Sequence, residues 1–317
     1  MLHTVAKLHY VSNMSQVRIA KQLGLSTATI SRLLQKARAE GIVRIEVREI
    51  FDPGEVGARL AEGLGLDEVV AADAPAAGAL PALAPHLARM LSGSGPGHGP
   101  SSGPSFGRSS GPGHGPVLML GWGRTVRAVI EAGLPAMPGV TVVPSTGGMQ
   151  NLANHFHSNE LARRAAEVTG GVPQLIHAPY LPAPELFRSF LEERSVRDAM
   201  ALWNRIDMAV VGIGVPYDPA NPNIESAARD PVLEGAAGDI VRHYFDDQGR
   251  VLDWRGEGRM IAVSAAQLRA APVSIGLAAG TDKLRSIAGA ARSGMINRLI
   301  TDLATGEALL DHLARDS

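Results

Sequence analysis

The stretch QVRIAKQLGLSTATISRL, residues 16–33, has the pattern of two short helices joined by a tight turn. Ala20 lies where the helices would cross and only a small side chain fits, and Gly24 lies at the turn, where a residue without Cβ adopts a positive φ at little cost. Apolar residues recur every three to four positions within each half, which is helical spacing. These residues are Ile19, Leu23, Leu25, Ile30 and Leu33. The stretch therefore predicts a helix-turn-helix.

The second helix of this motif leaves small polar and basic side chains on its outer face. Hydroxyl groups and an arginine near a helix start suit the DNA major groove, because the first turns must approach base edges closely. Ser15 and Ser26 suit N-caps, although their hydroxyls could instead bond phosphates. The candidate DNA-binding residues are Ser15, Gln16, Ser26, Thr27, Ala28, Thr29, Ser31, Arg32, Lys36 and Arg38. The alternative is a pair of amphipathic helices with no nucleic-acid role.

Positive charge is concentrated at the N-terminus. The 317-residue chain has a formal net charge of −1. Residues 1–50 contain eight Lys or Arg and three Glu, which gives +5 and leaves −6 for the remainder. Phosphate contacts supply most of the nonspecific affinity for DNA. A basic N-terminal segment on an acidic remainder therefore favours a DNA-binding domain attached to a sensor.

Composition limits the compartment and the class of protein. The apolar fraction of 45% supports a buried core, and the length allows two domains. The absence of cysteine excludes disulfides and thiolate chemistry, and fits a reducing cytoplasm. There is no signal-peptide pattern, and no apolar run reaches the roughly 18 residues that a membrane helix needs. We expect a cytoplasmic protein with no membrane partner.

Residues 1–52 are expected to form a winged helix-turn-helix domain. Residues 1–12 carry apolar side chains at helical spacing, which predicts a first helix packed under the motif. The sequence GIVRIEV (41–47) follows the second motif helix and alternates apolar with polar residues, which predicts a short strand or wing. Arg44 or Arg48 would contact the DNA backbone from this wing.

A break at Pro53-Gly54 predicts the start of the second domain, residues 55–317. Within it, residues 92–116 (SGSGPGHGPSSGPSFGRSSGPGHGP) are almost entirely Gly, Ser and Pro. Such a segment cannot bury enough apolar surface to offset its conformational entropy, so a disordered loop is predicted. His98 and His114 could bind a metal weakly, but a mobile loop without metal explains them as well.

Short apolar runs alternate with helical patterns through the second domain. Their dense Val, Ile and Leu content predicts strands covered on both faces, and therefore an α/β fold with a doubly wound, largely parallel sheet. Functional loops would then follow the carboxyl ends of the strands. The runs are DEVVAA (67–72), VLMLG (117–121), VTVVPS (140–145), QLIHAP (174–179), IDMAVVGIG (206–214), MIAVS (260–264), APVSIGL (271–277) and NRLIT (297–301), and helices are expected at 55–64 and 80–91.

The first of three glycine-marked turns is GWGRT, residues 121–125. A glycine turn that opens a helix presents free N–H groups to an anion, and Arg124 and Thr125 add a cation and a hydroxyl. The turn lacks the third glycine of a dinucleotide fingerprint and the lysine of a P-loop. It therefore predicts a phosphate or sugar-phosphate site, with a purely structural turn as the alternative.

The second turn contains Gly147-Gly148 within STGGMQN (145–151), whose hydroxyls and amides suit sugar hydroxyls. The third contains Lys283, one of only four lysines, expected in the first turn of a helix where the dipole opposes a cation. This placement favours an anionic ligand over a solvated surface lysine. Asp239 is a candidate for binding sugar hydroxyls. The candidate effector-binding residues are Gly121, Gly123, Arg124, Thr125, Gly147, Gly148, Asp239 and Lys283.

Supporting candidates are Gly212, Gly214 and Gly238, which precedes Asp239. His177 and Asp207 lie near strand ends, where a ligand role and a capping role are equally open. No His or carboxylate cluster has metal-ligand spacing, and there is no G-x-S-x-G signature. We therefore expect no metal, no cofactor and no catalytic residue.

Taken together, these motifs resemble the SorC family of bacterial transcriptional regulators over nearly the full length. The resemblance implies a winged helix-turn-helix, a body related to the sugar-phosphate isomerase and CoA-transferase fold, a phosphorylated sugar effector, and homodimers or homotetramers on symmetric operator DNA. It rests on the helix-turn-helix, GWGRT (121–125), STGG (145–148), HAPYLPAP (177–184), IDMAVVGIG (206–214), Gly238-Asp239 and GTDKLRSIAGAARSGMINRLITD (280–302). The 92–116 insertion and the sequence GLAAGTDK (276–283) depart from the family pattern.

The predicted function is a DNA-binding repressor or activator of a carbohydrate-utilisation operon, controlled by a phosphorylated sugar. One alternative is an isomerase-like enzyme, which needs a general base. Asp207 and Asp239 are the candidates for that base, and a Schiff base would have to use Lys283. A second alternative is that the C-terminal domain has lost its ligand and serves only to oligomerise the DNA-binding domain.

Overall fold

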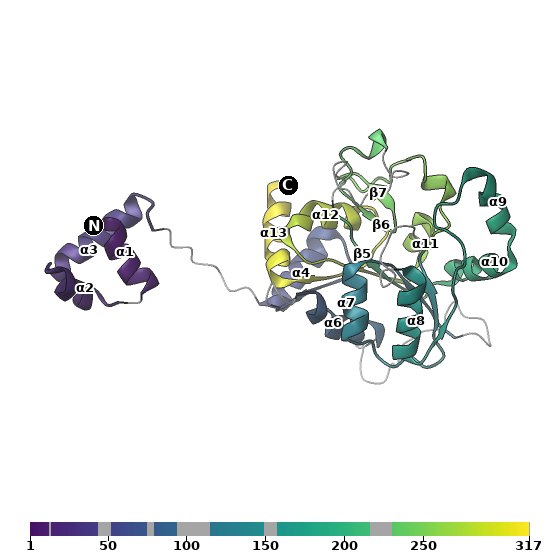
Figure 1. The fold of residues 1–317 in the computed structure, drawn as a ribbon, viewed down its shortest axis with the longest axis horizontal. Helices are drawn as coiled ribbons and strands as arrows, with labels where there is room; N and C mark the ends of the chain where they lie inside the picture. Colours follow the sequence, from purple (N-terminus) through teal and green to yellow (C-terminus); the bar gives the residue numbers. More distant parts are fainter. Residues whose placement is uncertain are drawn as a thin grey trace. The chain divides into compact units, whose positions relative to one another are not determined.

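A computed structural model of the chain describes residues 1–12, 14–43, 52–74, 79–93, 115–148, 157–215 and 230–316. The chain divides into two compact units, the head (Met1–Ile50) and the body (Phe51–Ser317) (Figure 1). Within the described ranges, no helix is both long and apolar enough to cross a membrane.

The head is a bundle of short helices around one small apolar cluster. It contains α1 (Leu2–Ala6), a π-helical turn η1 (Lys7–Val11), α2 (Gln16–Leu23) and α3 (Thr27–Ala39). Ala20 is buried between the helices, and Gly24 ends α2 with a φ of 65°. The cluster consists of Val5, Ile19, Ala20, Ile30 and Leu34, with Leu8, Met14, Leu23, Leu25 and Leu33 packed against it. The predicted motif geometry is present, and Leu34 is a core residue that the sequence pattern missed.

Both motif helices begin at a serine that caps the first turn. The Ser15 hydroxyl accepts a hydrogen bond from Arg18 N (3.3 Å), and the Ser26 hydroxyl accepts one from Thr29 N (3.1 Å). Gly41, with a φ of 70°, follows the end of α3. The predicted wing, with Arg44 and Arg48, falls mainly on residues outside the described ranges, so it stays a prediction.

The described residues of the body form a seven-stranded sheet between two layers of helices, with a small hairpin beside it. The main helices are α4 (Pro53–Leu64), α5 (Ala79–Ala82), α6 (Ala84–Leu91), α7 (Arg124–Ala132), α8 (Ser158–Thr169), α9 (Pro184–Glu192), α10 (Arg194–Ala201), α11 (Ala265–Ala270), α12 (Leu284–Arg292) and α13 (Leu303–Asp316). Short 3-10 turns are η4 (Leu202–Arg205), η6 (Pro231–Leu233), η7 (Glu257–Arg259) and η8 (Thr281–Lys283).

Every strand pair in the seven-stranded sheet is parallel, and the strand order is β1-β9-β8-β5-β2-β3-β4. The strands are β1 (Glu68–Ala72), β2 (Val117–Leu120), β3 (Thr141–Pro144), β4 (Val172–Pro173), β5 (Met208–Gly212), β8 (Val273–Leu277) and β9 (Arg298–Asp302). Strands β6 (Gly238–Ile240) and β7 (His243–Phe245) form a separate antiparallel hairpin. The predicted α/β class with a doubly wound parallel sheet is confirmed.

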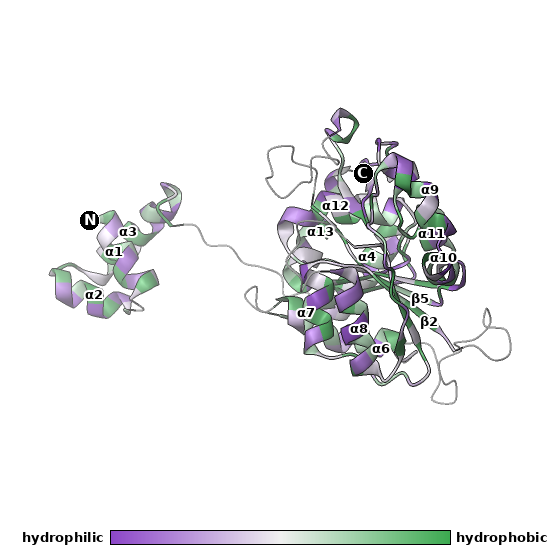
Figure 2. Ribbon diagram, turned by 45° about the vertical axis from the view of Figure 1, so that its right-hand side comes forward, coloured by the Kyte–Doolittle hydropathy of each residue, from purple (hydrophilic) through white to green (hydrophobic). Residues whose placement is uncertain are grey.

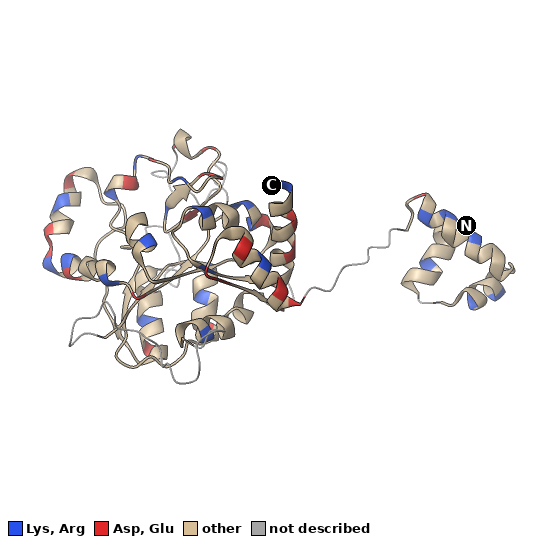
Figure 3. Ribbon diagram, turned by 180° about the vertical axis from the view of Figure 1, so that it is seen from behind, with Lys and Arg blue, Asp and Glu red and all other residues tan. Residues whose placement is uncertain are grey.

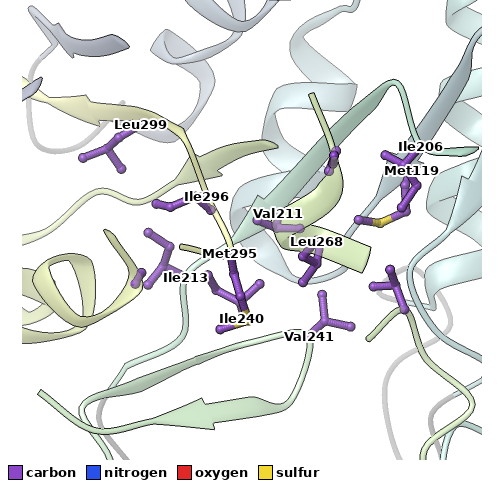
Figure 4. Packing of buried hydrophobic residues seen from close by; sticks show 14 of the residues in the cluster. Met119, Ile206, Val211, Ile213, Ile240, Val241, Leu268, Met295, Ile296 and Leu299 are labelled. Atoms are coloured by element: carbon purple, nitrogen blue, oxygen red, sulfur yellow. The ribbon is translucent and has the colours of Figure 1, made fainter. Parts of the chain in front are cut away.

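Both faces of the sheet are buried, which explains the continuous apolar runs. In β2, Leu118 and Leu120 belong to one core cluster with residues of α6, α7 and α8, whereas Val117 and Met119 belong to another, the large core cluster, with residues of α4, α12 and α13. Figure 1 shows these helix groups on opposite sides of the sheet, and Figure 2 shows hydrophobic residues concentrated along the central strands. Figure 4 shows part of the large core cluster to which Val117 and Met119 belong, including Met119, Val211 and Leu299.

Two predicted strands are absent from the sheet. The run QLIHAP does not form a strand, because the Asn159 side chain replaces the backbone ladder there: it accepts from Ile176 N (3.0 Å) and donates to Ile176 O (2.9 Å). The run MIAVS contributes only a β-bridge between Ala262 and Thr146, because its backbone bonds loops beyond the strand ends.

The strand beside QLIHAP, β4, lies at one edge of the sheet. The N–H groups of Val172 and Gln174 donate to carbonyls on the β3 side, Val140 O and Val142 O. The preceding Gly171 N donates to Ala166 O in α8, and Pro173, which lies between Val172 and Gln174, has no N–H group.

Pro53 begins α4 instead of only breaking the chain. Asp52 is the N-cap, and its carboxylate accepts hydrogen bonds from Gly54 N (2.8 Å) and Glu55 N (3.3 Å). Proline is favoured in this first position because the missing N–H group has no partner in a helix anyway. The helix therefore starts two residues before the predicted one. Most of the predicted 92–116 loop lies outside the described residues.

Candidate functional site

The strand order reverses between β2 and β5, and the candidate site lies where these strands end. The chain proceeds from β2 outward to β3 and β4, then returns to β5 and continues through β8 to β9 on the other side. Ligands of open α/β sheets bind outside the carboxyl ends of the strands at such a switch point. The segments that follow β2 and β5 are the GWGRT turn and Ile213-Gly214.

The GWGRT turn crosses closely over β5. Gly121 N donates to Val210 O (2.7 Å), and a Cβ at Gly121 would lie only 3.1 Å from Val211 Cα. Gly123, with a φ of 105°, is the N-cap of α7 and has no side chain to cap the free N–H groups of the first turn. Arg124 is exposed at this turn, and Thr125 is buried. The turn therefore has the geometry of an anion site at a helix N-terminus.

Lys283 joins this turn from a distant part of the sequence. It is the N-cap of α12, one position before the predicted first turn, and its ammonium group donates to Ile213 O at the end of β5 (2.7 Å). Burial lowers the pKa of Lys283; the nearby Arg124 lowers it further, and Asp282 and Asp239 oppose this. The structure therefore brings Arg124, Asp239 and Lys283 into one electrostatic neighbourhood.

Asp239 is held in place by close backbone packing. Its Oδ2 atom accepts a hydrogen bond from Arg242 N (3.0 Å), and its carbonyl accepts one from Gly214 N (2.9 Å). A Cβ at Gly214 would lie 2.0 Å from Asp239 Oδ1, so only glycine leaves the carboxylate in this position. A Cβ at Gly238 would lie 2.9 Å from Ser286 Cβ on α12. Gly214 and Gly238 are thus positioning residues for Asp239.

The Gly147-Gly148 turn donates its amides to the protein itself. Gly147 N donates to Ile261 O (2.9 Å), and Gly148 N donates to Ala178 O (2.7 Å). A Cβ at Gly147 would lie 2.4 Å from Ala178 O, which explains the glycine by packing. The buried Ser145 hydroxyl has no hydrogen-bond partner among the described residues. A role for Gly147 and Gly148 near a sugar therefore stays a prediction, without free amides as its basis.

The loop that carries Lys283 is fixed from α13. Gly280 N donates to Thr305 Oγ1 (2.8 Å) and to Asp302 Oδ2 (3.1 Å), and Gly280 has a φ of 112°. Asp302 also accepts from Thr305 N (3.0 Å). These contacts hold the lysine at the strand ends.

Arg242 is a site residue that the sequence reading missed. Its Cζ atom lies 5.0 Å from the centroid of the Trp122 ring, and its Nη1 atom donates to the Tyr244 hydroxyl (3.0 Å). Burial disfavours its charge, but Tyr244, Asp239 and Tyr180 raise its pKa overall, so it stays cationic. No local sequence pattern indicates this, because Trp122 belongs to a distant segment.

Asp207 does not join the site. Asp207 precedes β5 at its amino end, the opposite edge of the sheet, and its carboxylate accepts from Val117 N (2.8 Å). The structure therefore supports the structural role for Asp207. His177 is exposed in the segment after β4. His98 and His114 lie outside the described residues.

The candidate DNA-binding residues lie largely on the surface of the head. Thr27, Ala28, Arg32 and Arg38 are exposed on α3, and Lys36 is exposed and paired with Glu40 (3.6 Å). Ser15 and Ser26 are exposed N-caps, whereas Gln16, Thr29 and Ser31 are half-buried. Figure 3 shows that Lys and Arg outnumber Asp and Glu on the head helices. This surface suits a polyanion.

The fold defines a class of protein: a helix-turn-helix head joined to an α/β body that has a candidate anion site at the switch point of its sheet. A family model for sugar-binding domains matches residues 113–311. The chain is 31% identical to the sorbitol operon regulator of Klebsiella pneumoniae, over 96% of each protein. It is 30% identical to the deoxyribonucleoside regulator of Bacillus subtilis strain 168, over 97% of this chain and 96% of that protein.

Among solved structures, the full-length sorbitol operon regulator SorC from Klebsiella pneumoniae is similar with a TM-score of 0.69 at 29% identity, and the match covers 98% of each chain. The chain belongs to the SorC family of transcriptional regulators. The predicted family resemblance is thereby confirmed.

Proposed function

We propose that this protein is a DNA-binding transcriptional regulator of a carbohydrate-utilisation operon and that a phosphorylated sugar controls it. The observation that carries the proposal is the convergence of Arg124, Asp239 and Lys283 at the switch point of the sheet. These residues come from segments far apart in the sequence, and the head of the same chain carries a basic helix-turn-helix. One chain therefore combines a DNA-binding domain with a binding site for a charged metabolite.

The effector phosphate would lie at the first turn of α7. Its free N–H groups, the Arg124 guanidinium and the Lys283 ammonium are three sources of positive charge for a dianion. The Asp239 carboxylate would accept hydrogen bonds from sugar hydroxyls, because an ionised carboxylate is acceptor-only. This arrangement favours a phosphorylated sugar over a neutral one.

A purely regulatory role is favoured over an isomerase. A general base must reach the proton that it removes and needs a suitable pKa. Asp207 lies at the amino end of β5, away from the switch point, and the Asp239 carboxylate already accepts a backbone hydrogen bond from Arg242 N. Prolonged incubation with sugar phosphates should leave them unconverted, and borohydride should trap no Schiff base on Lys283.

We further propose that the protein acts as a homodimer or homotetramer. A single head reads one half-site, so a symmetric operator requires at least two heads. Effector binding would change operator affinity with a coupling free energy of about 1–3 kcal/mol, which is typical of allosteric proteins. Sedimentation analysis with and without DNA measures the number of subunits directly.

A gel-shift titration tests the function. The full-length protein is bound to promoter DNA of its own operon and titrated with a panel of sugar phosphates and the corresponding free sugars. We expect at least one sugar phosphate to change operator affinity about fivefold or more, and its free sugar to be much weaker. Unaltered operator binding across the whole panel, together with no thermal stabilisation, would favour a body that only oligomerises the head.

A further inference from the structure

The turn of the β6–β7 hairpin carries an unusual backbone conformation. Val241 and Arg242 are the two residues between the paired strands, and they have φ values of 53° and 66°. Two-residue hairpin turns use this conformation, but they normally contain Asn or Gly, because a side chain with Cβ is strained there. Neither residue is of a type that favours it.

Packing accounts for Val241 but not for Arg242. Val241 is 5% exposed and belongs to the large core cluster, where Figure 4 shows it with Ile240, Ile213 and Leu268. Arg242 instead directs a charged group toward the GWGRT turn, against the Trp122 ring. Strained residues cluster at ligand sites, where the conformation is retained for function.

The guanidinium of Arg242 has one buried donor that nothing in the described protein satisfies. Nη1 donates to the Tyr244 hydroxyl, whereas Nε is buried and has no hydrogen-bond partner among the described residues. Buried donors are almost always paired, so an unpaired one needs an explanation. A ligand oxygen beside Trp122 would supply the missing acceptor.

The neighbouring Asp239 supplies the complementary group. Its carboxylate accepts from Arg242 N and lies close enough to Lys283 to affect the lysine pKa. A cationic donor and an anionic acceptor thus lie side by side next to the proposed phosphate site. A sugar hydroxyl both accepts and donates a hydrogen bond, so adjacent hydroxyls match this pair.

We propose that Arg242 determines effector specificity by donating its Nε–H to an oxygen on the carbon chain of the effector, while Asp239 accepts from a hydroxyl of the same chain. This inference rests on the proposed function, because the phosphate at Arg124 and Lys283 positions that chain. The effector is then a phosphorylated sugar or polyol that carries oxygen on the carbons facing the hairpin. Analogues that lack oxygen there bind weakly.

The test uses Arg242→Gly in the full-length protein, because glycine removes the side chain and also relieves the backbone strain. The probes are inorganic phosphate, ribose 5-phosphate, glucose 6-phosphate, their 2-deoxy analogues and sorbitol 6-phosphate, measured by thermal shift and calorimetry. We expect the unliganded variant to melt at or above the wild-type temperature and to keep its stabilisation by inorganic phosphate. The sugar phosphate that best protects the wild type should bind at least tenfold more weakly.

A matched control is Val241→Gly, which changes the same turn but keeps the arginine. It should lower the melting temperature, because a buried side chain is lost, and it should keep the wild-type preference among the probes. A marked drop in the unliganded melting temperature of Arg242→Gly would show that the arginine is structural, and would overturn the inference.

The two proposals fail in distinguishable ways. If no probe protects the wild type, the proposed function is contradicted and this inference with it. If a sugar phosphate protects the wild type and Arg242→Gly binds it equally well, only the role of Arg242 is contradicted.

Discussion

The two motif helices of the head take their candidate DNA-binding residues from one short segment, between Ser15 and Arg38, whereas the body assembles its site from residues 121–125, 238–242 and 280–283. In the head, the serine caps and the small helical core place side chains that largely face solvent. In the body, strand order and close glycine contacts bring distant groups together, and several of these groups are buried. The loss of one side chain should therefore leave the remaining DNA-binding residues of the head in place, whereas the geometry of the body site depends on packing between distant segments.

The largest expected effect is the loss of effector response in Lys283→Met. A ligand at 100 times its Kd stabilises the folded protein by about 2.7 kcal/mol, and we expect this stabilisation to disappear while unliganded operator affinity stays unchanged. Thermal shift with the active sugar phosphate measures it. The control is Arg285→Met on α12. This substitution also removes a cation, but one that is paired with Asp247, so the stabilisation by ligand should persist. A normal response in Lys283→Met would contradict the anion site.

A second substitution should affect only the head. Arg32→Ala removes an exposed cation from α3, and a lost base contact costs about 1–3 kcal/mol, or roughly fivefold to 150-fold in operator affinity. Fluorescence anisotropy with operator DNA measures this loss, and sugar-phosphate stabilisation of the body should be unchanged. Lys7→Ala, an exposed cation outside the two motif helices, serves as the control. Equal losses in both variants would indicate nonspecific electrostatics instead of base reading.

Two substitutions at Ser26, with a smaller expected change in stability, distinguish a helix-capping role from a phosphate-binding role. Ser26→Ala removes the hydrogen bond from Thr29 N and should destabilise the head by about 1 kcal/mol. Ser26→Asp keeps an acceptor and suits the helix dipole, so head stability should return. If the hydroxyl also contacts a DNA phosphate, the carboxylate will repel it and operator affinity will stay low. Recovery of both properties would leave Ser26 with a capping role alone.

The smallest effect is a pH dependence confined to the body. Backbone hydrogen bonds from Arg255 N and Val232 N lower the pKa of Asp230 below its ordinary value of 3.8. The carboxylate therefore contributes its full stability above the ordinary value, and this contribution is lost as the pH falls through the lower folded-state pKa. Asp230→Asn should flatten the acid side of the melting-temperature profile of the body. The same change at exposed Asp253 should leave the profile as in the wild type.

The local sequence pattern predicts the helices and caps of the head, but it predicts only part of the secondary structure of the body. The turn at Gly24 and the serine caps depend on neighbours within four residues, so they were predictable. Most strands were also predictable, because burial on both faces leaves continuous apolar runs. The segment QLIHAP has the same kind of apolar run, yet the backbone N–H and C=O groups of Ile176 bond the Asn159 side chain instead of a neighbouring strand.

The site illustrates what the sequence could not supply. GWGRT and Lys283 were found because glycine turns and a rare lysine are visible in the sequence. Arg242 was not, because its meaning depends on a hairpin turn and on Trp122, which is distant in sequence. The β6–β7 strands are only three residues long, too short to give a periodic pattern.

The short edge strand β4 bears on how copies of this chain can associate. Along residues 171–174, each backbone N–H group is either bonded within the protein or, at Pro173, missing. A neighbouring chain that aligned along this margin would find no amide hydrogen to accept, so it could not prolong the sheet there. Extension of the sheet by a second copy is therefore disfavoured at the β4 edge.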